Sequence, residues 1–190
     1  MAGAARINGA ALARSILDFW FVEHGRDDWF ARRQKFDDEI RERFGAAHQA
    51  ARAGELEPLR ADPDGALALI ILLDQFSRNL FREDKRAFEQ DAEARDIARE
   101  AIERGFDMAA PEKRRAFFYM PFMHSEDLAD QARSVALFKE RLPGSYNERY
   151  AVDHCDIIKR FGRFPHRNRI LGRRSTPEET AYIESGGFNP

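Results

Sequence analysis

The sequence has a single cysteine and no apolar run that could cross a bilayer. Because Cys155 stands alone, no intrachain disulfide can form, and nothing indicates an oxidising compartment. The longest unbroken apolar run, residues 66–73, has eight residues, whereas a membrane helix needs about 20. Arg14 and Asp18 interrupt the N-terminal stretch where a signal peptide requires an apolar segment. We therefore expect a cytoplasmic protein with no membrane partner.

A strand pattern is missing as well. No run alternates apolar and polar residues between hairpin turns, and apolar residues recur instead at helical spacing, as at Phe36, Ile40 and Phe44. With 190 residues, 43% of them hydrophobic, the chain can bury one core. We predict a single all-α domain over residues 1–190, with about eight helices packed as antiparallel hairpins.

Capping residues and helix breakers place several helix boundaries. Asp62, followed by proline, begins a helix that is apolar nearly all round and is predicted to be central. A helix over residues 84–104 is rich in alanine and charge, so we expect it at the surface. Pro121 is expected to bend or end its helix, and Ser125 to cap the next one. Residues 176–179 form a capping-box sequence with proline at the first helical position.

Basic residues concentrate near the C-terminal end. Residues 161–174 hold five arginines, one histidine and no acid, although the chain carries a net charge of −2. Residues 157–177 hold seven Lys or Arg, and removing these from the total of 31 leaves 24 basic residues against 33 acidic ones. A nucleic-acid-binding protein usually spreads basic charge over a face, so we expect no nucleic-acid partner. An isolated basic strip indicates instead a small anion or an internal acidic partner.

The first candidate site lies in residues 72–82. Asp74 and Arg78 are four residues apart, as are Gln75 and Asn79, so both pairs share one side of a helix. One interpretation is a buried ion pair between Asp74 and Arg78 that joins helices. The other is the polar wall of a pocket in which Arg78 binds a ligand carboxylate or phosphate.

The second candidate site lies in residues 119–128. Ser125, Glu126 and Asp127 suit a helix start, where the two acids are favourable against the helix dipole. His124 lies at the predicted proline break beside these carboxylates. An imidazole there can change its charge near neutral pH and act as a general acid or base.

The third candidate site lies in residues 153–168. His154 shares an apolar helical stripe and should point inward, either as a hydrogen-bonded core residue or as a ligand-binding group. His166 follows a proline and precedes Arg167 and Asn168, where several cations and backbone N–H groups can converge on one anion. The alternative is a solvated basic loop.

Metal and nucleophilic chemistry find less support. Asp127, Asp153 and Asp156 are available as oxygen ligands, but the sequence has neither a His-Asp dipeptide nor His-Glu-x-x-His, so we assign no metal ligand. Cys155 adjoins His154, but neighbours on a helix point about 100° apart. A glycine-rich phosphate loop is absent too, and the sequence indicates no particular cofactor.

These segments resemble the hallmark segments of a bacterial family known as domain of unknown function 924. The similarity is carried, in the family's order, by LDQFSRNLFR, YMPFMHSEDL and FGRFPHRNRILGRRSTPEE, and it runs from about Ile16 to Phe188. The resemblance implies paired antiparallel helices similar to tetratricopeptide superhelices, without their repeat sequence, and it brings no established activity. The motif positions that carry over are Asp74, Gln75, Arg78, Asn79, His124, Glu126, Asp127, Arg163, His166, Arg167 and Asn168.

Our leading hypothesis is a cleft that binds a small anionic metabolite. Arg78, Arg163 and Arg167 would be its charge partners, and His124 and His166 would be acid or base groups if the protein is an enzyme. The other ligand-binding candidates are Asp74, Gln75, Asn79, Glu126, Asp127, His154 and Asn168.

Three alternatives stay open. The first is an interaction module that holds a peptide or protein tail on a groove, with Trp20, Trp29, Phe117 and Phe118 exposed. In the second, the basic strip is clamped against acids as a structural ion-pair cluster. The third, a metal-dependent hydrolase, has the least support. The sequence leaves the oligomeric state open.

Overall fold

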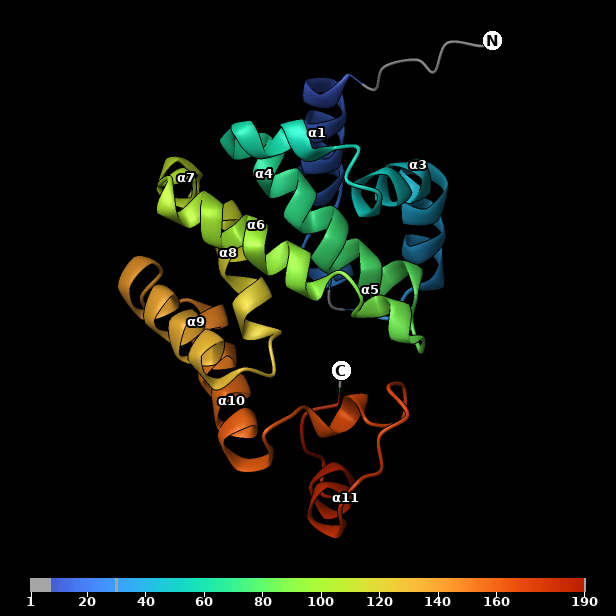
Figure 1. Ribbon diagram of the computed structural model, residues 1–190, viewed down its shortest axis with the longest axis vertical. Coiled ribbons are helices and arrows are strands. Elements are labelled where there is room, and N and C mark those ends of the chain that lie inside the picture. Colours follow the sequence, from blue (N-terminus) through green and yellow to red (C-terminus); the bar gives the residue numbers. More distant parts are fainter. Residues whose placement is uncertain (1–7, 30, 190) are drawn as a thin grey trace.

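The chain folds into helices that surround one long central helical segment (Figure 1). The computed structural model describes residues 8–29 and 31–189, and this part of the chain contains no strand. The predicted all-α class is therefore confirmed. The α-helices are α1 (Gly9–Asp18), α2 (Arg26–Trp29), α3 (Gln34–Arg52), α4 (Pro63–Ile70), α5 (Ser77–Leu80), α6 (Asp91–Glu103), α7 (Phe106–Ala109), α8 (Glu112–Met123), α9 (Leu128–Arg141), α10 (Tyr146–Phe161) and α11 (Pro177–Glu184).

The central segment consists of α4, a π-helical stretch over Ile71–Phe76, and α5. Its start is fixed as predicted, because the Asp62 carboxylate accepts the N–H of Gly65 at 2.9 Å and Pro63 occupies the first helical position. Every residue from 65 to 77 is buried. Helices α1, α6 and α8 pack around this segment, which explains why its sequence is apolar nearly all round.

The helix that we expected over residues 84–104 is shorter and less exposed than predicted. The Asp84 carboxylate caps a 3₁₀ turn over Lys85–Ala87 instead, so α6 begins at Asp91. The small apolar residues of α6, Ala98 among them, are buried where it packs on α4 and α8. Only its charged face is at the surface, because alanine allows close approach of the neighbouring helices.

Helix α8 continues through Pro121 and ends at Met123, two residues beyond the predicted break. The proline stands in the last turn, where it removes one backbone hydrogen bond. Its ring is buried with the other apolar side chains of this helix. The cap of α9 is Asp127 rather than Ser125, since the Asp127 carboxylate accepts the N–H groups of Ala129 and Asp130 at 2.8 and 3.1 Å. The Ser125 hydroxyl instead accepts the N–H of Asp127 and donates to Asp130.

The C-terminal segment, residues 162–189, lies beneath α5 and α8, and after α11 it turns back up toward these helices (Figure 1). Gly162 ends α10 in the left-handed region, with φ of 69°, and a 3₁₀ turn over Pro165–Arg167 follows. The predicted capping box is present between Thr176 and Glu179. A second small core of Ile157, Ile158 and Phe164, with Phe161, Tyr182 and Phe188 against it, holds this segment together.

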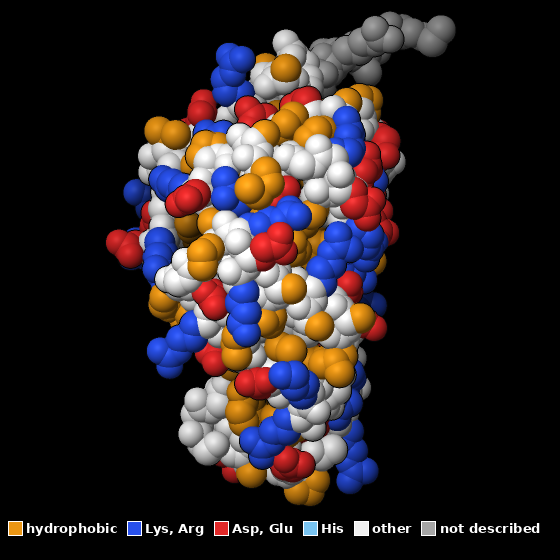
Figure 2. Space-filling view, turned by 90° about the vertical axis from the view of Figure 1, so that its left-hand side faces the viewer, with side chains coloured by type: hydrophobic (Ala, Val, Ile, Leu, Met, Phe, Trp, Pro, Cys, Tyr) orange, Lys and Arg blue, Asp and Glu red, His pale blue; other side chains and the backbone are white. Residues whose placement is uncertain are grey.

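The surface carries mixed charge. On the face in Figure 2, basic and acidic side chains alternate over the whole surface without a broad basic area. Among residues 8–29 and 31–189, no helix combines the length and apolar character needed to cross a bilayer.

Candidate functional site

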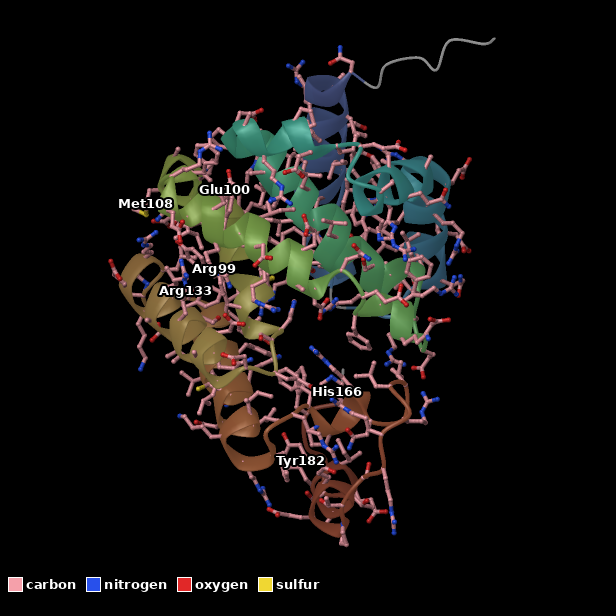
Figure 3. The ribbon with its side chains drawn as sticks, in the orientation of Figure 1. Arg99, Glu100, Met108, Arg133, His166 and Tyr182 are labelled. Carbon is pink, nitrogen blue, oxygen red and sulfur yellow. The ribbon has the colours of Figure 1, made fainter. Side chains whose placement is uncertain are left out.

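A pocket of about 830 Å³ lies where the C-terminal segment meets the central helical segment. The central segment and the end of α8 form one wall, and α10 and the C-terminal segment form the opposite one. Figure 3 shows His166 at the upper edge of the C-terminal segment, facing these helices, whereas Tyr182, a residue of α11, lies lower. The sequence candidates that line the pocket are Gln75, Arg78, Asn79, His124, His154, His166 and Arg167.

The remaining candidates lie outside the pocket wall and have partners of their own. Asp74 is buried directly behind the wall and contacts His124. Glu126 accepts Nη1 and Nη2 of Arg173 at 2.6 and 2.9 Å, and it also accepts the backbone N–H of Phe164. Asp127 caps α9.

Arg163 and Asn168 are likewise outside the pocket. Arg163 donates Nε and Nη2 to the two carboxylate oxygens of Glu179 at 2.6 and 2.8 Å. Asn168 donates to the same carboxylate and to Ser175. This half of the basic strip therefore forms an ion-pair cluster that joins the C-terminal segment to itself and to the start of α9.

Arg167 is the buried cation of the pocket with the fewest partners. Its exposed fraction is 7%, and its guanidinium lies over the rings of Phe88 and Phe164 at 4.7 and 4.4 Å. Nη1 donates to the backbone oxygen of His124 at 3.0 Å, Asp91 lies 3.9 Å away, and Nε has no partner among the described residues. Burial, together with the charge of Arg78, lowers the pKa of Arg167 to about 10.

Arg78, by contrast, is fully engaged. Its Nη1 and Nη2 donate to the carboxylate of Asp91 at 2.9 and 3.0 Å, and Nη1 also donates to the backbone oxygen of Ala87. Asp74 is a second acidic neighbour at 3.5 Å. The predicted pair between Asp74 and Arg78 is thus present, but Asp91 is the closer partner. Sequence reasoning missed Asp91, because nothing local shows that the first residue of α6 faces the central segment.

His124 is oriented by a buried carboxylate. Its Nδ1 lies 2.8 Å from Oδ1 of Asp74, whose exposed fraction is 1%. Gln75 donates to the other oxygen of Asp74 at 2.6 Å. Burial alone would raise the pKa of Asp74, but His124 and Arg78 hold it below its ordinary value, so the carboxylate is ionised. An ionised carboxylate accepts the Nδ1–H of His124 and so fixes the orientation of the ring.

His154 and His166 are neutral imidazoles in the same pocket. Nδ1 of His154 lies 2.7 Å from the backbone oxygen of Tyr150, an acceptor, so this nitrogen carries the proton. Burial lowers the pKa of both histidines to about 3. The ring of Phe188, which the sequence analysis did not single out as a site residue, lies 4.5 Å from His154 and 5.3 Å from His166. His154 points inward, as its apolar stripe predicted.

The pocket histidines do not form a compact metal site. Within the described chain, the group with three ligand atoms inside 4.8 Å of one another is Glu23, His24 and Glu39, away from the pocket. Arg43 donates to both of these glutamates, at 2.5 and 3.1 Å, and so supplies the positive charge there.

The aromatic residues that a peptide groove would expose are largely internal. Trp20, Phe117 and Phe118 have exposed fractions of 0–1%. Trp29 is partly buried, stacks on Trp20 at 5.5 Å and reaches the pocket rim. The expectation that all four aromatics are exposed on a groove is therefore wrong for Trp20, Phe117 and Phe118, which are buried in the core.

The fold and the site define an all-helical protein with a cationic, histidine-lined pocket. The sequence profile of the bacterial proteins of unknown function DUF924 matches residues 16–187. The chain belongs to this family. A solved structure from Agrobacterium tumefaciens, the protein of unknown function ATU0120, is 46% identical, with a TM-score of 0.90, and the match covers 94% of this chain and 100% of that one. A search of curated proteins finds no match.

Proposed function

We propose that the protein binds a small organic anion in the pocket, with a carboxylate or phosphate group of the anion hydrogen-bonded to Arg167. The incomplete partnering of Arg167 supports this proposal most directly. A guanidinium has five N–H donors, and a buried one is costly unless these are used. Arg167 spends one hydrogen bond on the backbone oxygen of His124, and its Nε is unpartnered. A planar anion in the pocket would give this guanidinium the charged acceptor that it lacks at hydrogen-bond distance.

The charge balance of the pocket favours an anion as well. Arg78 lies close enough to Arg167 for its charge to lower the pKa of Arg167, and the imidazoles of His154 and His166 are neutral. Asp91 lies near both guanidiniums, but both of its carboxylate oxygens already accept hydrogen bonds from Arg78. Asp74 and Asp91 together balance these two guanidiniums, but the pocket lining as a whole holds five arginines and one glutamate, so an incoming anion would meet a wall of mainly basic side chains.

The apolar part of the lining favours an organic anion over an inorganic one. Phe88, Met120, Met123 and Phe188 all line the pocket beside the polar groups. Pockets for small molecules combine such apolar surface with a few polar groups that fix orientation. A cavity of about 830 Å³ also exceeds what a bare phosphate ion would fill.

The test is a thermal-shift screen of the purified protein against inorganic phosphate, acetate, adipate, benzoate and a sugar phosphate. We expect an organic anion to raise Tm in the wild type and to have no effect on Arg167→Met. Arg163→Met is the matched control, because Arg163 belongs to the same basic strip but binds Glu179 outside the pocket. This control should melt lower than the wild type and still respond to the anion.

Two results would overturn the proposal. One is stabilisation that persists unchanged in Arg167→Met, which would place the anion elsewhere. The other is a wild type that no organic anion in the screen stabilises while short peptides do, which would favour the interaction-module alternative.

A further inference from the structure

The arrangement behind His124 exceeds what anion binding requires. A binding site needs only the guanidinium, yet a buried carboxylate stands behind the imidazole and is itself held by Gln75. A carboxylate that fixes the tautomer and the ring orientation of a histidine is the arrangement found behind catalytic and metal-binding imidazoles. The pocket histidines form no compact metal site, which favours a catalytic role for His124.

His124 is placed to act as a general base. Its Nδ1 faces Asp74 inside the protein, and His124 lines the pocket, which leaves Nε2 as the ring nitrogen for the cavity side. A neutral imidazole can take a proton from water near neutral pH.

Positive charge lies next to this base. Nη2 of Arg78 is 3.5 Å from Oδ1 of Asp74, the same oxygen that His124 contacts at 2.8 Å. Arg167 donates to the backbone oxygen of His124 itself. Fixed positive charge beside a base stabilises the negative oxygen that develops when water adds to a carbonyl group.

The pocket offers water as the attacking group. Among the described residues that line it there is no serine, threonine or cysteine. Cys155, although next to His154 in the chain, is not among the lining residues. Hydrolysis through an acyl-enzyme on a serine or cysteine is therefore not the chemistry that this wall supports.

We infer that the protein hydrolyses a carboxylate-bearing ester, with His124 as the general base and Asp74 as its positioning residue. The inference rests on the proposed function, since Arg167 would hold the carboxylate. The oxygen of water bonds to the acyl carbon while Nε2 of His124 takes a proton from that water. The bond between the acyl carbon and the alcohol oxygen then breaks, and the imidazolium returns its proton to the leaving alkoxide. One water is consumed, an acid and an alcohol form, and no atom is oxidised or reduced.

The experiment compares mono-4-nitrophenyl adipate with 4-nitrophenyl hexanoate, which has a methyl group in place of the free carboxylate. Release of nitrophenol above the spontaneous rate is followed from pH 5 to 8.5. We expect faster turnover of the adipate ester and a loss in kcat of about 10²- to 10⁴-fold in His124→Gln. His24→Gln is the matched control, because His24 lies outside the pocket, and its rate should equal that of the wild type.

Asp74→Asn provides the second variant and a readout that a purely structural role would not move. Gln75 donates to the other oxygen of Asp74, so in this variant the amide oxygen would face Gln75 and the amide NH₂ would face Nδ1 of His124. The Nδ1–H tautomer then loses its acceptor, so ¹⁵N NMR should show a changed tautomer, and the pH–rate profile should shift. If the variant melts at a lower temperature but its folded fraction keeps the pH–rate profile of the wild type, Asp74 is not a positioning residue for His124.

Binding of adipate itself, measured by calorimetry, separates the two proposals. If adipate binds but its ester is hydrolysed no faster than in buffer, or equally fast by His124→Gln, the hydrolytic inference is overturned and the anion site stands. If adipate does not bind and its ester is not hydrolysed, both proposals are overturned for carboxylates.

Discussion

Replacing Arg167 with methionine should leave the unliganded protein as stable as before or slightly more stable. Methionine keeps an unbranched apolar stem against Phe88 and Phe164 and removes the buried charge. Burial and the charge of Arg78 lower the pKa of Arg167 to about 10, well below the ordinary range of arginine. At neutral pH this corresponds to a penalty of about 3 kcal/mol for keeping the guanidinium charged, relieved only as the pH rises above 10.

The lost contacts offset most of that gain. The hydrogen bond from a charged donor to the backbone oxygen of His124 contributes about 1.5 kcal/mol. The two ring contacts of the guanidinium contribute about 1 kcal/mol together. The net change in the free energy of unfolding should therefore lie within about 1 kcal/mol of zero, on the stabilising side.

The same substitution four residues earlier should have the opposite sign. Arg163→Met removes both hydrogen bonds to Glu179, whose exposed fraction is 2%, and leaves that carboxylate with only Asn168 and the N–H of Thr176. Glu179 then lacks its charged donor, so this variant should be less stable than the wild type. Urea denaturation at pH 7 measures both variants. An Arg167→Met variant that loses more than about 2 kcal/mol would refute the reasoning and make Arg167 structural.

Two further predictions concern stability. Burial lowers the pKa of His154 and His166 to about 3, so below pH 6.5 the unfolded chain takes up protons that the folded chain does not. The free energy of unfolding should therefore fall by about 2 kcal/mol per imidazole between pH 7 and pH 5. In the same titration, His166→Gln should show a weaker pH dependence of stability than the wild type. An equal pH dependence in both proteins would contradict a buried, neutral imidazole at His166. Gly65→Ala should destabilise the start of α4, because the added Cβ would lie 2.2 Å from the backbone oxygen of Leu59. A loss of about 2 kcal/mol in urea denaturation is expected, and a neutral result would show that the 3₁₀ turn before α4 can shift.

Local signals were sufficient for much of the fold. The Asp62 cap, the central helix and the capping box at Thr176 all depend on residues close together in the chain. Pro121 shows the limit of such signals, because buried packing carries α8 two residues past the proline. The start of α9 shows it as well, since Ser125 and Asp127 are both good caps and only the bonds of the folded chain distinguish them.

The sequence points to seven residues that line one pocket, but it does not show which candidates belong to the pocket and which to the ion-pair cluster. Arg163 and Arg167 are indistinguishable in the sequence, since each stands in the same arginine-rich strip. In the fold one faces Glu179, and the other enters the pocket with too few acceptors. The difference depends on which acids lie near each arginine in the fold. Asp91, near Arg167, is distant in the sequence and is brought close by tertiary packing, about which the periodicity of one sequence carries no information.

Calorimetric titration of adipate into the wild type and into Arg167→Met tests the central claim most directly. Truncating one partner of a buried, hydrogen-bonded charge pair costs about 2–5 kcal/mol. The dissociation constant of the variant should therefore be raised by between about 30-fold and several thousand-fold while its melting temperature is maintained. Equal affinity in both proteins would contradict the claim that Arg167 holds the anion.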